Sequence, residues 1–178
     1  MKKLLVVIGK SGSGKTTLIA ELIRRYPEQF KKVVTCTDRH PRIGEIDGVD
    51  YHFLPTKYFI DNPDLVLTKK TNDGFYYGTR KSNLFSNTHH LLLTSRLTGV
   101  AKLVSMGIRN VAIVNISISN ELRIERMRQR GDTEESISNR LTEDAVSEHG
   151  TDFGRNPVIN LDANQTFDQN VECLSWVR

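Results

Sequence analysis

The chain has 178 residues, a length at which one domain with a sizeable buried core is the simplest expectation. Its 38% hydrophobic and 26% charged content is that of an ordinary globular protein and excludes a disordered chain. The net charge is +4, but the basic residues gather in several separate places. This distribution suits a small polyanion better than a nucleic-acid duplex, and no basic-aromatic pattern typical of nucleic-acid binding is present. We therefore expect no nucleic-acid partner.

The apolar runs and the cysteines indicate the cellular compartment of the protein. The longest apolar run, Leu4 to Ile8, is far too short to cross a bilayer or to form a signal peptide. The two cysteines, Cys36 and Cys173, suggest neither a disulfide framework nor a cysteine-based zinc site. The sequence predicts a cytoplasmic protein with no membrane partner, and it leaves monomer and homodimer open.

The N-terminal part predicts a strand, a helix and a further strand in that order. The apolar, β-branched run Lys2–Ile8 ends at a glycine, as a buried parallel strand does. Apolar residues at helical spacing follow in Thr16–Tyr26, and Pro27 stops that helix. Val33–Val34 indicates a second strand. Residues 36–80 are then irregular and rich in turn residues, as expected of an insertion at the sheet edge.

The remaining chain alternates between strands and helices. Further strands are expected at 91–93, 111–116 and 158–160, and helices at 100–106, 120–130 and 132–148 and after Thr166. Asp132 and Glu135 form a capping-box-like start of one helix, and Thr166 and Gln169 cap the C-terminal one. The alternation predicts an α/β fold, with a parallel sheet covered by helices on both faces.

A glycine-rich loop joins the first strand to the first helix. "GKSGSGKTT", Gly9 to Thr17, fits the phosphate-loop pattern in the context that this motif requires. Its glycines let backbone N–H groups surround an anion at a helix N-terminus. Lys15 would neutralise the β and γ oxygens of a nucleoside triphosphate, and the Thr16 hydroxyl would bind Mg²⁺. The residues predicted to bind this nucleotide are Gly9, Ser11, Gly12, Ser13, Gly14, Lys15, Thr16 and Thr17.

A second charged stretch is suited to bind a phosphoryl acceptor. "DRHPRIGEIDGVDYHF", Asp38 to Phe53, has neither helical nor alternating periodicity. An acceptor with its own phosphate needs its own cations, because two phosphates repel each other. Arg39 and Arg42 could bind that phosphate through forked pairs, and Tyr51 would add a hydroxyl donor.

These motifs resemble the guanylate kinase family. Its pattern, T-x-R-x-P-R-x-G-E-x-D-G-x-D-Y-x-F, matches "TDRHPRIGEIDGVDYHF", Thr37 to Phe53, and "YYGT", Tyr76 to Thr79, also matches. Arg126 to Leu141 is similar to the family's lid and the helix after it, and Asn156 to Asp162 to its last strand. The resemblance implies a P-loop NTPase-type core (1–35, 90–126 and 141–178), a nucleoside-monophosphate-binding insertion (36–89) and a lid (127–140).

The resemblance also implies an activity and site residues. It implies that the γ-phosphoryl group of ATP is transferred to a nucleoside 5′-monophosphate, with GMP or dGMP as first choice. The implied catalytic residues are Lys15, Arg126, Arg130 and Arg140. The implied acceptor-binding residues are Thr35, Arg39, Arg42, Tyr51, Thr68, Tyr77, Thr79 and Arg96. Arg123 and Arg128 are expected on a solvated helix surface, whereas Tyr76 is left open between core and ligand contact.

The residues that would read the base depart from the family pattern. Thr68 stands where the family has a glutamate that accepts from guanine, and "TSRLTG", Thr94 to Gly99, replaces D-x-D-x-Q-G, with Arg96 at the second aspartate. The sequence therefore predicts weak discrimination for guanine. Two alternatives stay open: a kinase for a different or modified (deoxy)nucleoside monophosphate, and a non-catalytic, guanylate-kinase-like protein-binding module. The latter tend to lose the phosphate loop or the lid arginines, which this chain retains.

Overall fold

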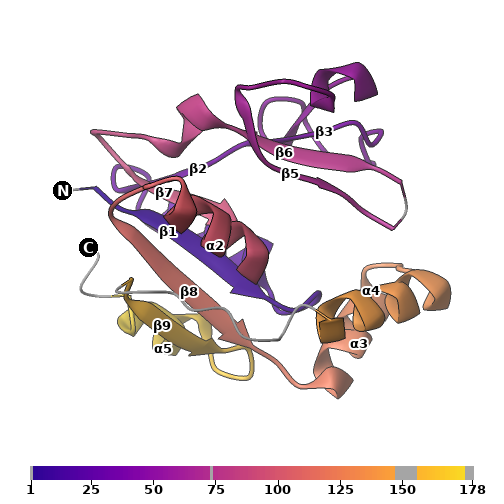
Figure 1. Cartoon of the computed structure of the whole chain (residues 1–178). Helices are drawn as coiled ribbons and strands as arrows, with labels where there is room; N and C mark the ends of the chain where they lie inside the picture. Colours follow the sequence, from indigo (N-terminus) through magenta and orange to yellow (C-terminus); the bar gives the residue numbers. More distant parts are fainter. Residues whose placement is uncertain (1, 73, 147–155, 175–178) are drawn as a thin grey trace.

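The computed structural model describes residues 2–72, 74–146 and 156–174. Its larger sheet has five strands, all parallel, in the order β2-β7-β1-β8-β9 (Figure 1). The strands span Phe30–Lys32 (β2), His90–Thr94 (β7), Leu4–Gly9 (β1), Val111–Ser117 (β8) and Val158–Asp162 (β9). The central strand β1 lies between two strands reached by separate crossovers, and ligands bind at such a switch point in open α/β sheets.

Helices cover both faces of this sheet because the side chains of β1 alternate between two buried layers. Leu5 and Val7 belong to the core under α1 (Lys15–Arg25) and α5 (Phe167–Glu172). The intervening residues of β1 belong to the core under α2 (Leu97–Ser105). The predicted α/β class, with a parallel sheet and helices on both faces, is therefore confirmed. Among the residues that the structure describes, no helix is long and apolar enough to span a membrane.

A second, four-stranded sheet lies beside the first, in the upper part of Figure 1. Its strands, in sheet order, are β4 (Tyr51–Phe53), β3 (Thr35–Thr37), β6 (Tyr76–Arg80) and β5 (Leu65–Lys70). The short helices η1 (Thr56–Phe59) and η2 (Lys81–Leu84) flank β5 and β6 in sequence. The predicted strand at Val33–Val34 is wrong, because both residues link β2 to β3. The buried Val33 side chain packs in the core under α2 instead.

Helices α3 (Asn120–Gln129) and α4 (Glu134–Val146) lie at the carboxyl ends of β1 and β8 (Figure 1). The Ser136 N–H donates to the Thr133 hydroxyl at 3.2 Å at the start of α4. The predicted cap Asp132 is therefore wrong, and the predicted end of this helix at residue 148 lies outside the described residues. The predicted cap of α5 is confirmed, because Thr166 and Gln169 form a reciprocal capping box.

Candidate active site

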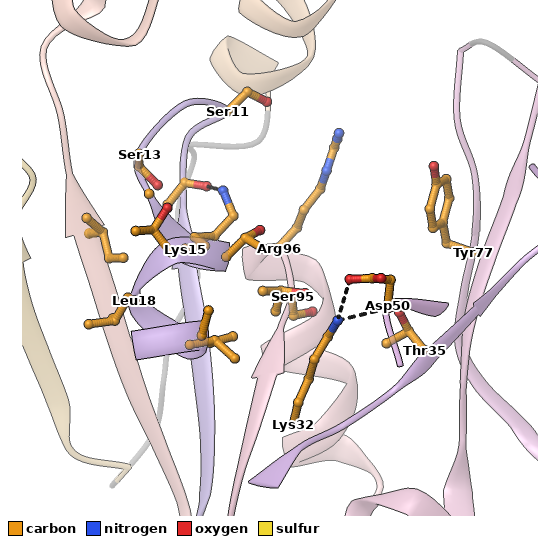
Figure 2. A pocket seen from close by; sticks show the side chains of 18 of the residues that line it. Ser11, Ser13, Lys15, Leu18, Lys32, Thr35, Asp50, Tyr77, Ser95 and Arg96 are labelled. Atoms are coloured by element: carbon orange, nitrogen blue, oxygen red, sulfur yellow. Dashed lines mark hydrogen bonds and ion pairs between the residues drawn. The ribbon is translucent and has the colours of Figure 1, made fainter. Parts of the chain in front are cut away.

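A cavity of about 2100 Å³ lies between the carboxyl ends of the central strands and the second sheet. Figure 2 shows Ser11, Ser13 and Lys15 on one side, Thr35 and Tyr77 on the other, and Arg96 between them. All residues that the sequence assigns to ATP, to the acceptor or to catalysis line this cavity. The fold thus brings together segments that lie more than a hundred residues apart in sequence.

The phosphate loop between β1 and α1 keeps the backbone shape that an anion needs. Gly9, Gly12 and Gly14 have φ angles of +145°, +82° and +92°, which other residues rarely adopt. A Cβ at Gly12 would also lie 2.8 Å from the Arg123 carbonyl oxygen. Gly14 is the N-cap of helix α1 and provides no side-chain cap, so the first N–H groups of the helix are available to phosphate oxygens. The Ser13 hydroxyl is buried and has no hydrogen-bond partner in the described part of the chain, so it is available to hydrogen bond to a bound ligand.

Lys15 lies within this loop and is held by it. Its ammonium donates to the carbonyl oxygens of Gly9 at 2.7 Å and of Lys10 at 2.9 Å. Burial lowers the pKa of Lys15 to about 8; Asp144 opposes this shift, and the charges of Arg96, Arg130 and Arg140 add to it. The positive charges around the ammonium favour a bound polyphosphate, which would in turn raise this pKa.

We predict that kcat/KM for ATP falls as the pH rises through about 8. Lys15 is protonated below its pKa of about 8 in the ligand-free protein and loses its charge above it. Only the charged form neutralises phosphate oxygens, so capture of ATP weakens on the alkaline side. Initial rates between pH 6.5 and 9.5 at limiting ATP and saturating acceptor measure this. A flat profile across pH 7 to 9 would contradict a role for this ammonium in ATP capture.

Three arginines lie near the phosphate loop: Arg126 of α3, Arg130 immediately after α3, and Arg140 of α4. Arg126 donates to the Ala163 carbonyl oxygen at 3.0 Å and to that of Gly12 at 3.5 Å. Arg130 donates to Asp132 at 2.9 Å, and Arg140 lies 3.9 Å from the same carboxylate. Arg130 and Arg140 lie close enough to lower the pKa of Lys15. Such a set of cations can neutralise the charge of a phosphoryl group in transfer.

The acceptor stretch is built around Arg39. Its guanidinium is almost buried and donates to both Glu45 oxygens at 2.9 Å and to the Tyr77 hydroxyl at 3.3 Å. The ring of Tyr51 lies 5.6 Å from this guanidinium and 5.9 Å from the ring of Tyr77. Burial, and then the neighbouring Tyr77, raise the pKa of Tyr51, so its hydroxyl stays a donor. The arrangement suits a phosphate monoester.

Glu45 was not predicted as a site residue, although it stands in the acceptor stretch. It also accepts from the backbone N–H of Arg42 at 2.7 Å, while the Arg42 side chain is exposed and lines the cavity. Glu45 therefore fixes the loop that carries both arginines. The signal in the sequence was an acid three residues after one arginine and six after the other.

The end of the cavity where the family resemblance places the base (the base-facing end) has hydroxyls and cations among its lining residues. Its hydroxyls come from Thr35, Thr68 and Thr79. Strand β5 has a bulge between Val66 and Lys69, after which Lys69 pairs with Tyr77 of β6. Arg96 immediately precedes α2 and hydrogen bonds to Glu143 of α4. Lys32 was not predicted either; Figure 2 shows it with Asp50, whose carbonyl oxygen it contacts at 2.9 Å.

Comparison with known proteins fits this geometry. The sequence model of the guanylate kinase family matches residues 1–172. The chain belongs to the guanylate kinase family. It is 31% identical over 173 residues to a guanylate kinase of Chlamydia abortus, with 93% of this chain and 84% of the relative covered. A guanylate kinase of Prochlorococcus marinus is 30% identical over 183 residues, covering 98% and 97%.

Solved structures share the fold of this guanylate kinase family member. The crystal structure of guanylate kinase from Anaplasma phagocytophilum superimposes with a TM-score of 0.63 at 20% sequence identity, covering 99% of this chain and 84% of that one. A gluconokinase from Sinorhizobium meliloti superimposes with a TM-score of 0.54 at 17% identity, covering 96% and 88%. At these identities the likeness concerns the fold alone.

One helix residue of this guanylate kinase family member, Arg123, lies in an unexpected place. Arg123 was predicted on a solvated surface, which is wrong: its side chain is 3% exposed and donates to Asp144 at 2.7 Å. The same Asp144 oxygen accepts from the Ser11 N–H at 2.9 Å. Thus α3, α4 and the phosphate loop meet at one buried carboxylate. Arg128 is exposed as predicted, and Tyr76 stacks on Phe59 within a small core.

The residues present fit ATP with Mg²⁺. Thr16 lies in the first turn of α1, and its exposed side chain lines the cavity. Among the described residues, no group of three or more histidine, cysteine or acidic side chains could hold a metal by itself. Mg²⁺ needs no such cage, since it commonly binds one or two protein oxygens together with substrate phosphates and water.

Proposed function

We propose that the protein transfers the γ-phosphoryl group of ATP to GMP, giving ADP and GDP, with Mg²⁺ as the metal. The observation that carries this proposal is the shared cavity, which Lys15 lines from the donor side and Arg39, Tyr51 and Tyr77 line from the acceptor side. The relatives named guanylate kinase, matched over most of their length, support GMP as the acceptor. A different or modified nucleotide is not favoured by these relatives.

The mechanism relies on positioning and on charge. Lys15 and the loop N–H groups hold the β- and γ-phosphates, while Arg39, Arg42, Tyr51 and Tyr77 hold the phosphate of GMP. An oxygen of that phosphate attacks the γ-phosphorus as the bond to the β–γ bridging oxygen breaks, and ADP leaves with those electrons. Arg126, Arg130 and Arg140 neutralise the charge of the phosphoryl group. Thr16 would hold Mg²⁺, which would supply further charge neutralisation to the phosphates.

Three parts of the chain would divide this work. We propose a core at 1–35, 90–126 and 141–178, an acceptor-binding insertion at 36–89 and a lid at 127–140. The second sheet, which falls almost entirely within the insertion range, supports this division. A lid that closes over both nucleotides would exclude water, which would otherwise compete as acceptor.

A non-catalytic protein-binding module is the alternative from another class. The loss of Lys15, Thr16 or a lid arginine would favour it, but these side chains are present and line one cavity. We propose that the enzyme acts on small nucleotides in the cytoplasm, and we retain monomer or homodimer as the expected state. No site for a nucleic acid is part of this proposal.

A screen of acceptors tests the proposed function. With ATP and Mg²⁺, ADP release is measured for each common ribo- and deoxynucleoside monophosphate, with a parallel series in EDTA. GMP or dGMP is expected to give the highest kcat/KM, and EDTA to stop the reaction. ADP release with none of these acceptors would contradict the kinase assignment and favour the binding module.

A further inference from the structure

Charges at the base-facing end of the cavity are exchanged relative to the family pattern. The pattern has carboxylates at the positions of Thr68 in β5 and Arg96 before α2. This chain offers a hydroxyl and a guanidinium there, and the neighbouring Lys69 adds an ammonium. Guanine presents two donors, N1–H and the 2-amino group, so these cations alone would repel its donor edge.

A carboxylate from a different element lies among these cations. Glu143 of α4 accepts a hydrogen bond from Arg96 and lies 3.6 Å from the Lys69 ammonium. Its side chain is 15% exposed and lines the cavity. Burial opposes its ionisation, but Arg96, Lys69 and the backbone N–H of Asn72 outweigh burial and lower its pKa. Glu143 is therefore a carboxylate at neutral pH, held by Arg96 and by Lys69, the residue next to Thr68.

Other carboxylates that line the cavity are engaged elsewhere. Glu45 is bound by Arg39 at the acceptor-phosphate site, and Asp50 lies 3.9 Å from Lys32. Asp144 is bound by Arg123 and by the phosphate loop. Within the described residues, Glu143 is thus the acid that contacts the cations at the base-facing end.

We propose that Glu143 determines specificity for guanine, by accepting hydrogen bonds from N1–H and the 2-amino group in place of the carboxylates missing at Thr68 and Arg96. This inference rests on the proposed function and names the residue that reads its substrate. A carboxylate offers about four lone-pair positions, so it can accept from guanine while it keeps its bond to Arg96. Guanine would replace Lys69 as the second partner of Glu143, because Lys69 lies farther from the carboxylate than Arg96 does.

The position of Glu143 on α4 links reading of the base to phosphoryl transfer. Arg140 lies three residues earlier and therefore on the same face of this helix. Because Arg140 faces the Lys15 region, a base bound at Glu143 would hold α4 where its arginine can act. Correct base binding should then raise kcat as well as lower KM, as in induced-fit discrimination.

The test compares GMP with inosine 5′-monophosphate, which lacks the 2-amino group. In Glu143→Gln, kcat/KM for GMP is expected to fall about ten- to a hundredfold, because a charged acceptor is lost. The value for inosine 5′-monophosphate should fall less, so the GMP preference shrinks. Glu21→Gln is the matched control: Glu21 also pairs with two cations, Arg24 and Arg25, but lies on α1 outside the cavity. This control should keep the wild-type preference.

The double variant Glu143→Gln with Thr68→Glu separates base reading from mere tethering of α4. Returning a carboxylate to β5, where the family pattern has it, should restore the GMP preference. A Glu143→Gln enzyme with an unchanged GMP preference, or a double variant that does not regain it, would overturn the inference while the kinase assignment stands. If instead the wild-type protein does not phosphorylate GMP, the proposed function itself fails.

Discussion

Replacing Lys15 by alanine is expected to lower kcat by about a hundred- to a thousandfold. The ammonium lies among the loop carbonyl oxygens at the start of α1, where it can follow the γ-phosphoryl group during transfer. Removing one preorganised charge or donor from a transition state costs about a hundred- to a thousandfold in kcat. The three arginines do not replace it, because Arg126 lies on α3, Arg130 just after α3 and Arg140 on α4, and none lies in the loop.

The fold should survive this substitution. The buried side chains of α1 are Leu18, Ile19 and Leu22, and the lysine ammonium contacts the carbonyl oxygens of its own loop. Thermal unfolding should therefore stay close to wild type, and Lys57→Ala, at an exposed lysine of η1, should keep full activity. Initial rates of ADP release with GMP measure the effect. Turnover at the wild-type rate in a pure Lys15→Ala sample would refute the kinase assignment.

The sequence was most informative where function needs contiguous residues at fixed spacing. A phosphate loop needs glycines, a lysine and a hydroxyl residue at fixed spacing in one short segment. The order of residues in Gly9 to Thr17 was therefore enough to predict a phosphate loop there. The acceptor stretch is similar, since Arg39, Arg42 and Tyr51 lie close together in sequence. The main strands were also predictable, because long buried parallel strands are continuously apolar.

Contacts between segments that are distant in the sequence produce no pattern of fixed spacing. Asp144 meets Ser11 across 133 residues, and Glu143 meets Arg96 across 47, and no local spacing reports either contact. Arg123 was misplaced because α3 carries charges around most of its surface, which hides the face that turns inward. The strands β3 and β4 were missed because each has three residues, too few to show alternation.

Replacing Arg39 and replacing Arg42 should have different effects on stability and on the kinetics with GMP, although both arginines lie on the same loop. Arg39 is almost buried and holds Glu45, whereas the Arg42 side chain is exposed in the cavity. Arg39→Ala should therefore lower stability by about 1–3 kcal/mol, because Glu45 loses its partner. It should also raise the KM for GMP and lower kcat, with kcat/KM falling about a hundredfold or more.

Arg42→Ala removes a cation without leaving a buried carboxylate unpaired, since Glu45 keeps Arg39. We expect a rise in the KM for GMP of about tenfold, a lower kcat and no change in thermal stability. In both variants the affinity for ATP should stay within about twofold of wild type, because Lys15 and the phosphate loop lie across the cavity from Tyr77, which contacts Arg39 (Figure 2). Calorimetric titration with each nucleotide separates the two sites. Weaker ATP binding with unchanged GMP binding would show that this loop serves the donor and not the acceptor.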